Sequence, residues 1–234
     1  MAFDPNKYKG FHSSEKVLPV VLLLDVSGSM AGDKIRILYE SVNRMIEELD
    51  KLSKKQECGF KIAIITFGNE VRVDLRYTAV KDLLGKVTPV NAGGMTPLGK
   101  ALDLAKDMID DKTETPGRWY KPAVVLVSDG MPNDQYEGPL QQFIGEGRSA
   151  KTQRFSLAIQ ANLDVLKRFA SENDFCMTAE NVADIPKAFN FITMSVSTRS
   201  ASANPNVFAG VSSTNTEGAV SDSTPEFDDD DEFV

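Results

Sequence analysis

Residues 18–30 have the sequence Leu-Pro-Val-Val-Leu-Leu-Leu-Asp-Val-Ser-Gly-Ser-Met, an unbroken apolar run that ends at an aspartate and a short polar loop. An apolar run without polar alternation is typical of a β-strand that is buried on both faces. After the loop, from Ile35 to Leu49, apolar residues recur at helical spacing. A buried strand that leads through a loop into an amphipathic helix is a building unit of α/β folds.

The same alternation of strand and helix continues along the chain. Further apolar runs predict strands at 61–67, 123–127, 155–159 and 175–178. Amphipathic helices are predicted at 97–109, 140–151, 163–171 and 185–196. Residues 71–75 alternate and follow 61–67 after a short turn, which requires an antiparallel neighbour because a parallel return needs a long crossover. The sequence predicts a doubly wound, Rossmann-like α/β fold: a six-stranded, mostly parallel sheet with one antiparallel edge strand and helices on both faces.

Charge and composition divide the 234 residues into three expected segments. The net charge of −8 lies wholly in residues 200–234, which contain eight acids and no Lys or Arg. The remaining chain is neutral, which argues against nucleic-acid binding because that function needs a basic face. We expect an N-terminal leader at 1–16, one folded domain at 17–197, and a disordered Ser/Thr-rich acidic tail at 198–234.

Several protein classes are excluded by what the sequence lacks. No apolar stretch approaches the length of about 18 residues that a membrane-spanning helix needs. No apolar run follows the first lysines as it would in a signal peptide, so we expect a cytoplasmic protein. The two cysteines, Cys58 and Cys176, lack zinc-site spacing, and His12 is the only histidine. Zinc binding and histidine-based catalysis are therefore not indicated.

Three loops rich in oxygen ligands follow or precede predicted elements at one edge of the sheet. The residues that could bind a metal are Asp25, Ser27, Ser29, Thr96 and Asp129. In an open α/β sheet, ligands bind beyond the carboxyl ends of the strands, where these loops meet. Two carboxylates and three hydroxyls make an all-oxygen site that suits Mg²⁺ or Mn²⁺. Because the hydroxyls are neutral, the bound ion would attract a further anionic oxygen from outside.

Each loop also has an interpretation without metal. The two serines could cap the following helix, Thr96 could be an N-cap, and Asp129 before Gly130 could be a simple turn. Their coincidence at one sheet edge favours a joint role. Asp33 and Asp134 are interpreted as cap or turn residues and are not assigned to the metal.

The combination of Asp25-Val-Ser27-Gly-Ser29, a threonine before a helix, and Ser128-Asp129-Gly130 after a strand resembles a known motif. It is similar to the metal-ion-dependent adhesion site (MIDAS) of von Willebrand factor type A (VWA) domains, over about residues 17–197. The resemblance implies that the five residues named above hold Mg²⁺, or Mn²⁺ or Ca²⁺. It also implies that a partner protein donates a Glu or Asp carboxylate to the metal, and that the protein is not an enzyme.

A second resemblance concerns the stretch Gly93-Gly-Met-Thr-Pro-Leu-Gly99. Together with a compact intracellular body, it is similar to the bacterial tellurite-resistance TerY-like branch of VWA proteins. That resemblance implies a scaffold or adaptor in stress response, or in signalling with a kinase and a phosphatase as partners. The eight carboxylates of the tail also predict weak self-association, in which the tail of one copy reaches the metal of another.

Two alternative functions stay open at this stage. Phosphatases of the haloacid-dehalogenase type also place an aspartate after the first strand and use Mg²⁺, but they need a second acid two residues further on, where this chain has Ser27. The other alternative is a metal-free structural scaffold, which metal titration would distinguish. No phosphate-binding GxxxxGK[ST] loop occurs, so nucleotide hydrolysis is not indicated.

Overall fold

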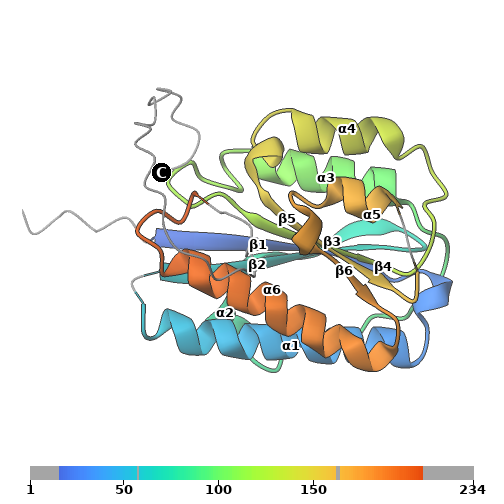
Figure 1. The fold of residues 1–234 in the computed structure, drawn as a ribbon, viewed down its shortest axis with the longest axis horizontal. Coiled ribbons are helices and arrows are strands. Elements are labelled where there is room, and N and C mark those ends of the chain that lie inside the picture. Colours follow the sequence, from blue (N-terminus) through green and yellow to red (C-terminus); the bar gives the residue numbers. More distant parts are fainter. Residues whose placement is uncertain (1–15, 57, 162–163, 208–234) are drawn as a thin grey trace, which may run out of the picture.

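The computed structural model describes residues 16–56, 58–161 and 164–207 (Figure 1). The sheet consists of β1 (Lys16–Asp25), β2 (Cys58–Phe67), β3 (Val71–Ala79), β4 (Ala123–Ser128), β5 (Gln153–Ile159) and β6 (Cys176–Ala179). The strand order is β3-β2-β1-β4-β5-β6. The β2–β3 pair is antiparallel and the other neighbours are parallel. The predicted six-stranded sheet with one antiparallel edge strand is confirmed.

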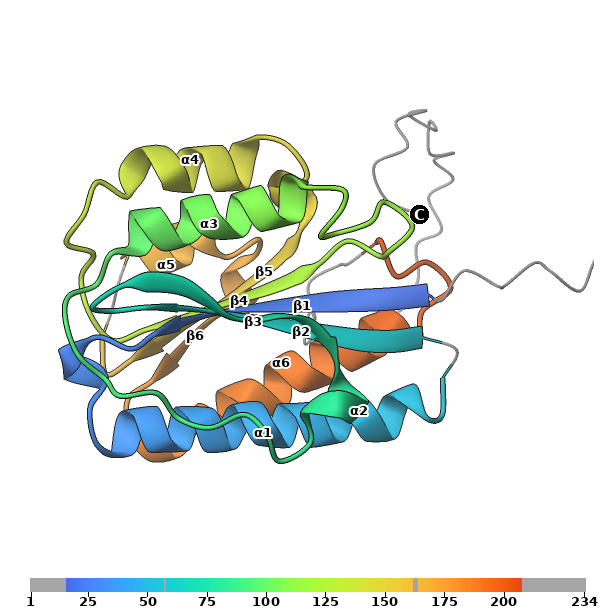
Figure 2. The same cartoon turned by 180° about the vertical axis from the view of Figure 1, so that it is seen from behind.

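Helices cover both faces of the sheet (Figures 1 and 2). On one face lie α1 (Asp33–Ser53), α2 (Val80–Leu83) and α6 (Ile185–Ser200), and on the other lie α3 (Leu98–Asp110), α4 (Glu137–Gly145) and α5 (Asp164–Phe169). Of the helix expected at 163–171, Leu163 lies outside the described residues. The short α2 was not predicted, because a single helical turn is too brief to show a periodic pattern.

The position of β1 at the centre of the sheet explains its apolar sequence. Leu22 and Leu24 pack into the core against α1 and α6, whereas Val21 and Leu23 pack into the core against α3 and α4. All four side chains are fully buried, and burial of each contributes roughly 1.5–3 kcal/mol. The edge strand β3 instead alternates half-buried and exposed residues, as its sequence pattern indicates.

The helix expected at 140–151 differs from the observed elements. Here α4 begins three residues earlier, ends at Gly145, and is followed by a separate short turn at Ser149–Lys151. Gly147 has a φ of +66°, a left-handed conformation that interrupts a helix. Asp110 at the end of α3 then accepts the backbone N–H of Arg148 at 2.9 Å and of Ser149 at 3.0 Å. These contacts with α3 fix the turn.

The described chain begins and ends at the same edge of the sheet, the one where the parallel strands β1 and β4 begin. The last helix continues to Ser200, beyond the expected end at about 196. Asn206 then accepts a hydrogen bond from the backbone N–H of Lys121, two residues before β4, at 2.8 Å. Residues 198–200, expected in the disordered tail, instead complete α6. The leader up to residue 15 and the tail from residue 208 lie outside the described residues, so those parts remain predictions. None of the helices within 16–56, 58–161 and 164–207 is long and apolar enough to cross a membrane.

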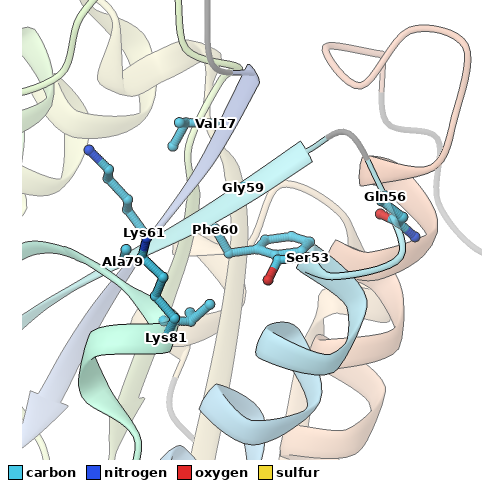
Figure 3. A pocket seen from close by; sticks show the side chains of 9 residues that line it. Val17, Ser53, Gln56, Gly59, Phe60, Lys61, Ala79 and Lys81 are labelled. Atoms are coloured by element: carbon cyan, nitrogen blue, oxygen red, sulfur yellow. The ribbon is translucent and has the colours of Figure 1, made fainter.

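A pocket of about 270 Å³ lies near the amino-terminal ends of β1 and β2 (Figure 3). It is lined by Val17, Phe60, Lys61 and Lys81 among others. The ring of Phe60 lies toward Ser53 in Figure 3, whereas the Lys61 side chain points away from it. The Lys61 ammonium lies 4.7 Å from the centre of the Trp119 ring. With lysines and no carboxylate in its lining, this pocket is not a candidate metal site.

Candidate metal centre

The ends of two neighbouring parallel strands position the candidate centre. Asp25 is the last residue of β1 and Ser128 is the last residue of β4. These strands are adjacent, with Leu24 opposite Val127. The helix that follows β1 covers one face of the sheet and the helix that follows β4 covers the other (Figures 1 and 2). The two loops therefore diverge, and such a switch point is where open α/β sheets bind ligands.

Asp25 is the most buried acid of the centre, with no exposed surface. One carboxylate oxygen accepts the backbone N–H of Ser27 at 2.8 Å, and the other accepts the Ser128 hydroxyl at 2.5 Å. Burial raises the pKa of Asp25, the hydrogen bonds from Ser128 and Ser27 oppose that shift, and the charge of nearby Asp129 adds to it. A buried carboxylate with a second acid beside it is a group that a cation stabilises.

A chain of hydroxyl contacts connects the first loop to Asp129. The hydroxyls of Ser27 and Ser29 are 3.0 Å apart, and Ser29 donates to Asp129 Oδ1 at 2.6 Å. Asp129 Oδ2 accepts a hydrogen bond from Lys34 Nζ at 2.5 Å. Ser27 stands at the N-cap of the turn Gly28–Met30 but makes no side-chain capping hydrogen bond. The alternative in which the Ser27 side chain caps this turn is therefore not observed.

Thr96 reaches the same point from the second loop. Its backbone N–H donates to Asn133 Oδ1 at 2.9 Å, and its carbonyl accepts the Asn133 N–H at 3.1 Å. A Cβ placed on Gly130 would lie 3.4 Å from Thr96 Oγ1 and 3.8 Å from Ser29 Oγ. The hydroxyls of two loops therefore face the residue next to Asp129. All five residues predicted from the sequence lie together at this edge.

Glycines allow the second loop to pack against the first. The N–H of Gly28 donates to the carbonyl of Gly94 at 3.1 Å, and the N–H of Gly93 donates to the carbonyl of Val26 at 2.8 Å. Gly94 has a φ of +79°, and a Cβ there would lie 2.5 Å from the backbone nitrogen of Asn69. Only glycine fits this position without displacing a loop.

Comparison with known proteins identifies the family of the chain. The sequence model of the von Willebrand factor type A domain matches residues 20–191. The chain belongs to the VWA domain family. Matrilin-3 of Gallus gallus is 24% identical to it over 165 residues, which cover 66% of this chain and 34% of matrilin-3. The VWA domain thus spans about a third of the length of that relative.

Solved structures show that the fold is shared. Proximal thread matrix protein 1 of the mussel byssus has a TM-score of 0.61 at 17% identity, covering 76% of this chain and 48% of that one. A further structure of that protein, described as having a zinc-occupied MIDAS motif, has a TM-score of 0.56 at 16% identity, covering 76% and 46%. The vWF domain of the type V pili tip protein Mfa5 from Porphyromonas gingivalis has a TM-score of 0.57 at 14% identity, covering 76% of this chain and 94% of that one.

Two acids near the centre of this VWA domain have other contacts. Asp134 accepts the backbone N–H groups of Gly99 at 3.0 Å and Lys100 at 3.1 Å, and so caps the first turn of α3. Its interpretation as a capping residue is confirmed. Asp33 begins α1 and pairs with Arg36 at 2.8 Å on the exposed surface.

Three contributors were not predicted as part of the centre: Lys34, Ser128 and Asn133. Ser128 belongs to the quoted motif, and its position at a strand end beside Asp25 could have indicated its role. Lys34 follows Asp33 at the start of a predicted helix, where a lysine is ordinarily a solvated residue. The signal available in the sequence was that a lysine in the first turn of a helix lies at its positive end, which is unfavourable unless the lysine has an acidic partner.

The donor set of this VWA domain determines which metals fit. Across the described ranges 16–56, 58–161 and 164–207, no group of three or more His, Cys, Asp or Glu residues gathers. The centre combines two carboxylates with three hydroxyls, which are all hard oxygen donors. Such donors favour Mg²⁺ and Mn²⁺ over metals that prefer thiolate or imidazole.

Proposed function

We propose that this VWA domain is a metal-dependent protein-binding scaffold. Asp25, Ser27, Ser29, Thr96 and Asp129 would hold one divalent ion, Mg²⁺ or otherwise Mn²⁺ or Ca²⁺. The observation that carries the proposal is the convergence of two buried carboxylate side chains and three hydroxyls, from three separate loops, at one sheet edge.

A bound divalent ion would supply an exposed positive charge with room for an outside ligand. Ser29 is exposed, whereas Asp25, Ser27 and Thr96 are buried, so the open side of the centre faces solvent at Ser29. Neutral hydroxyls leave charge on the ion, and a Glu or Asp carboxylate of a partner protein is the complementary group. The chain's own residues position the ion and exclude water at Asp25.

Two exposed methionines define the surroundings that the partner would meet. Met95 and Met131 have 64% and 65% of their surface exposed. They lie on the two loops that hydrogen-bond each other through Thr96 and Asn133. Flexible, polarizable methionines suit adaptable protein-binding surfaces. The proposed partner therefore presents an acidic residue with apolar side chains beside it.

The phosphatase alternative lacks a necessary group. A general acid is needed two residues after the aspartate, and Ser27 at that position contacts the Ser29 hydroxyl instead. We propose binding without turnover. A metal-free scaffold is the second candidate, and the experiment below distinguishes it.

The finer assignment to the TerY-like branch rests on the resemblance at 93–99 alone. A cytoplasmic location, a role in tellurite resistance or stress response, and a kinase and a phosphatase as partners are proposals on the same footing. Self-association through the acidic tail is also a proposal. Its geometric support is that the described chain ends at the edge opposite the candidate centre, which favours contact with a second copy over contact within one chain.

Thermal unfolding with and without metal tests the proposed function. At a metal concentration of about one hundred times Kd, wild type should gain about 2.7 kcal/mol. That corresponds to roughly 5–11 °C, since 1 kcal/mol is about 2–4 °C for a domain of this size. Asp25→Asn should abolish the gain. Asp134→Asn is the matched control: it should change stability little, because asparagine caps helices about as well as aspartate, and it should keep the full metal response.

The two variants separate a site effect from a general effect of charge. Equal metal shifts in wild type and Asp25→Asn would show that the ion binds elsewhere. If the thermal unfolding curves of wild type with metal and with chelator coincide at equal ionic strength, the function that is left is the metal-free scaffold.

A further inference from the structure

Lys34 makes an ion pair with a carboxylate of the candidate centre. Its Nζ lies 2.5 Å from Asp129 Oδ2; the Lys34 side chain is 20% exposed, and that of Asp129 is fully buried. Lys34 is the second residue of α1. The helix N-terminus carries partial positive charge, which disfavours a base by about 0.3–1 kcal/mol. The contact with Asp129 compensates for this unfavourable position.

This ion pair differs from the others made by α1. Arg36 and Lys51 pair with acids three or four positions away on the same helix, and Lys54, the residue after the helix, pairs back to Asp50. Lys34 instead pairs with a residue 95 positions away, and so joins α1 to the loop after β4. Exposed pairs along a helix contribute little, whereas removing one partner of a buried pair leaves an uncompensated charge.

We propose that Lys34 is the resident cation of the metal-free centre and that it sets both metal affinity and ligand preference. This inference rests on the proposed function. Asp25 and Asp129 with Lys34 carry a formal charge of −1, which a divalent ion changes to +1. Without Lys34 the same centre would change from −2 to 0. Lys34 therefore weakens metal binding by repulsion, and it makes the loaded centre more attractive to a carboxylate.

The same contact holds the loops together in the absence of metal. Asp129 is fixed on one oxygen by Ser29 and on the other by Lys34. With its charge paired, Asp129 can remain buried before an ion arrives. The centre is thus preorganised for metal by an internal cation, at the expense of affinity.

Calorimetric titration of Mn²⁺ into the full chain tests the proposal. Lys34→Met, which has a similar length and no charge, should tighten the Kd by about tenfold, or about 1.4 kcal/mol. Lys34→Arg keeps the charge and should stay close to wild type. Lys100→Met is the matched control, because Lys100 is an exposed lysine near the start of α3 beside the Asp134 cap. Solvent screening should limit its effect to about twofold.

A second measurement uses acetate as the carboxylate probe on the Mn²⁺-loaded protein. Acetate should bind Lys34→Met more weakly than wild type, while the Lys100→Met value should not change. If Lys34 had only a structural role, Lys34→Met would lower stability without tightening Mn²⁺ binding and weakening acetate binding. If Lys34→Met does not fold, Lys34→Gln replaces it in both titrations.

Each outcome bears on one proposal or on both. Equal Mn²⁺ affinity in wild type and Lys34→Met, or weaker affinity in Lys34→Met, overturns the inference and leaves the proposed function intact. If Lys34→Met binds Mn²⁺ and wild type does not, the result supports the inference that Lys34 opposes the metal. The same result overturns the proposed function of the wild type. Absence of binding in all variants overturns both.

Discussion

Replacing Gly94 with alanine should both destabilise the protein and weaken metal binding. Gly94 has a φ of +79°, and a Cβ there would lie 2.5 Å from the backbone nitrogen of Asn69 and 2.6 Å from its Cα. Because these are backbone atoms, no side-chain rotation relieves the collision. The carbonyl of Gly94 also accepts the N–H of Gly28, so displacement of one loop moves the loop that carries the serines.

Gly85→Ala provides the magnitude of the backbone strain without the collision. Gly85 has a φ of +67°, and a Cβ there would meet no atom within 4 Å. A left-handed alanine costs roughly 1–2 kcal/mol at either position. Overpacking adds about 1–3 kcal/mol at Gly94 alone. We therefore expect a loss of about 1–2 kcal/mol for Gly85→Ala and about 2–5 kcal/mol for Gly94→Ala.

Urea unfolding of the two variants in chelator, followed by Mn²⁺ titration, measures both effects. Gly94→Ala should unfold at lower urea concentration than Gly85→Ala and bind Mn²⁺ more weakly, whereas Gly85→Ala should bind like wild type. Equal free energies of unfolding for the two variants would refute the collision at Asn69. Wild-type Mn²⁺ affinity in a destabilised Gly94→Ala would refute the coupling between the two loops.

Two further predictions concern the thiol at the buried end of β2 and the methionines at the metal edge. Burial raises the pKa of the Cys58 thiol to about 11, so about one molecule in a thousand carries the reactive thiolate at pH 8. Alkylation followed by mass spectrometry should modify Cys58 only as the pH approaches that value or the protein unfolds, and rapid modification at pH 8 would contradict this. The double variant Met95→Ser, Met131→Ser should keep its Mn²⁺ affinity and its stability within about 0.5 kcal/mol. When immobilised, the double variant should nevertheless retain less of any partner protein that wild type binds in Mg²⁺ and releases in chelator. Equal amounts of partner retained by the variant and by wild type would exclude the methionines from the binding surface.

The sequence predicts the sheet and the five candidate metal residues because both depend on local patterns. The apolar run before Asp25 indicates a buried strand, and parallel strands place their carboxyl ends at one edge, so the residues that follow them meet. Ser27 and Ser29 are recognisable because they lie in the same short loop as Asp25.

The features that escaped prediction depend on contacts between distant residues. Lys34 approaches Asp129 only because α1 and the loop after β4 are brought together in the folded chain. The end of α4 depends on the left-handed Gly147 and on Asp110, contributed by another helix. No local periodicity encodes either contact.

The common edge at which the described chain begins and ends determines how the domain is tethered. Lys16 starts β1 there, and Asn206 is held beside Lys121 at the same edge. Whatever precedes residue 16 or follows residue 207 is therefore attached on the far side from Asp25 and Asp129 (Figure 1). A neighbouring domain, a tag or a surface linked at either position should leave the approach to the metal edge open. Immobilisation at residue 16 or 207 is thus an orientation suited to measuring ion and partner binding at the metal edge.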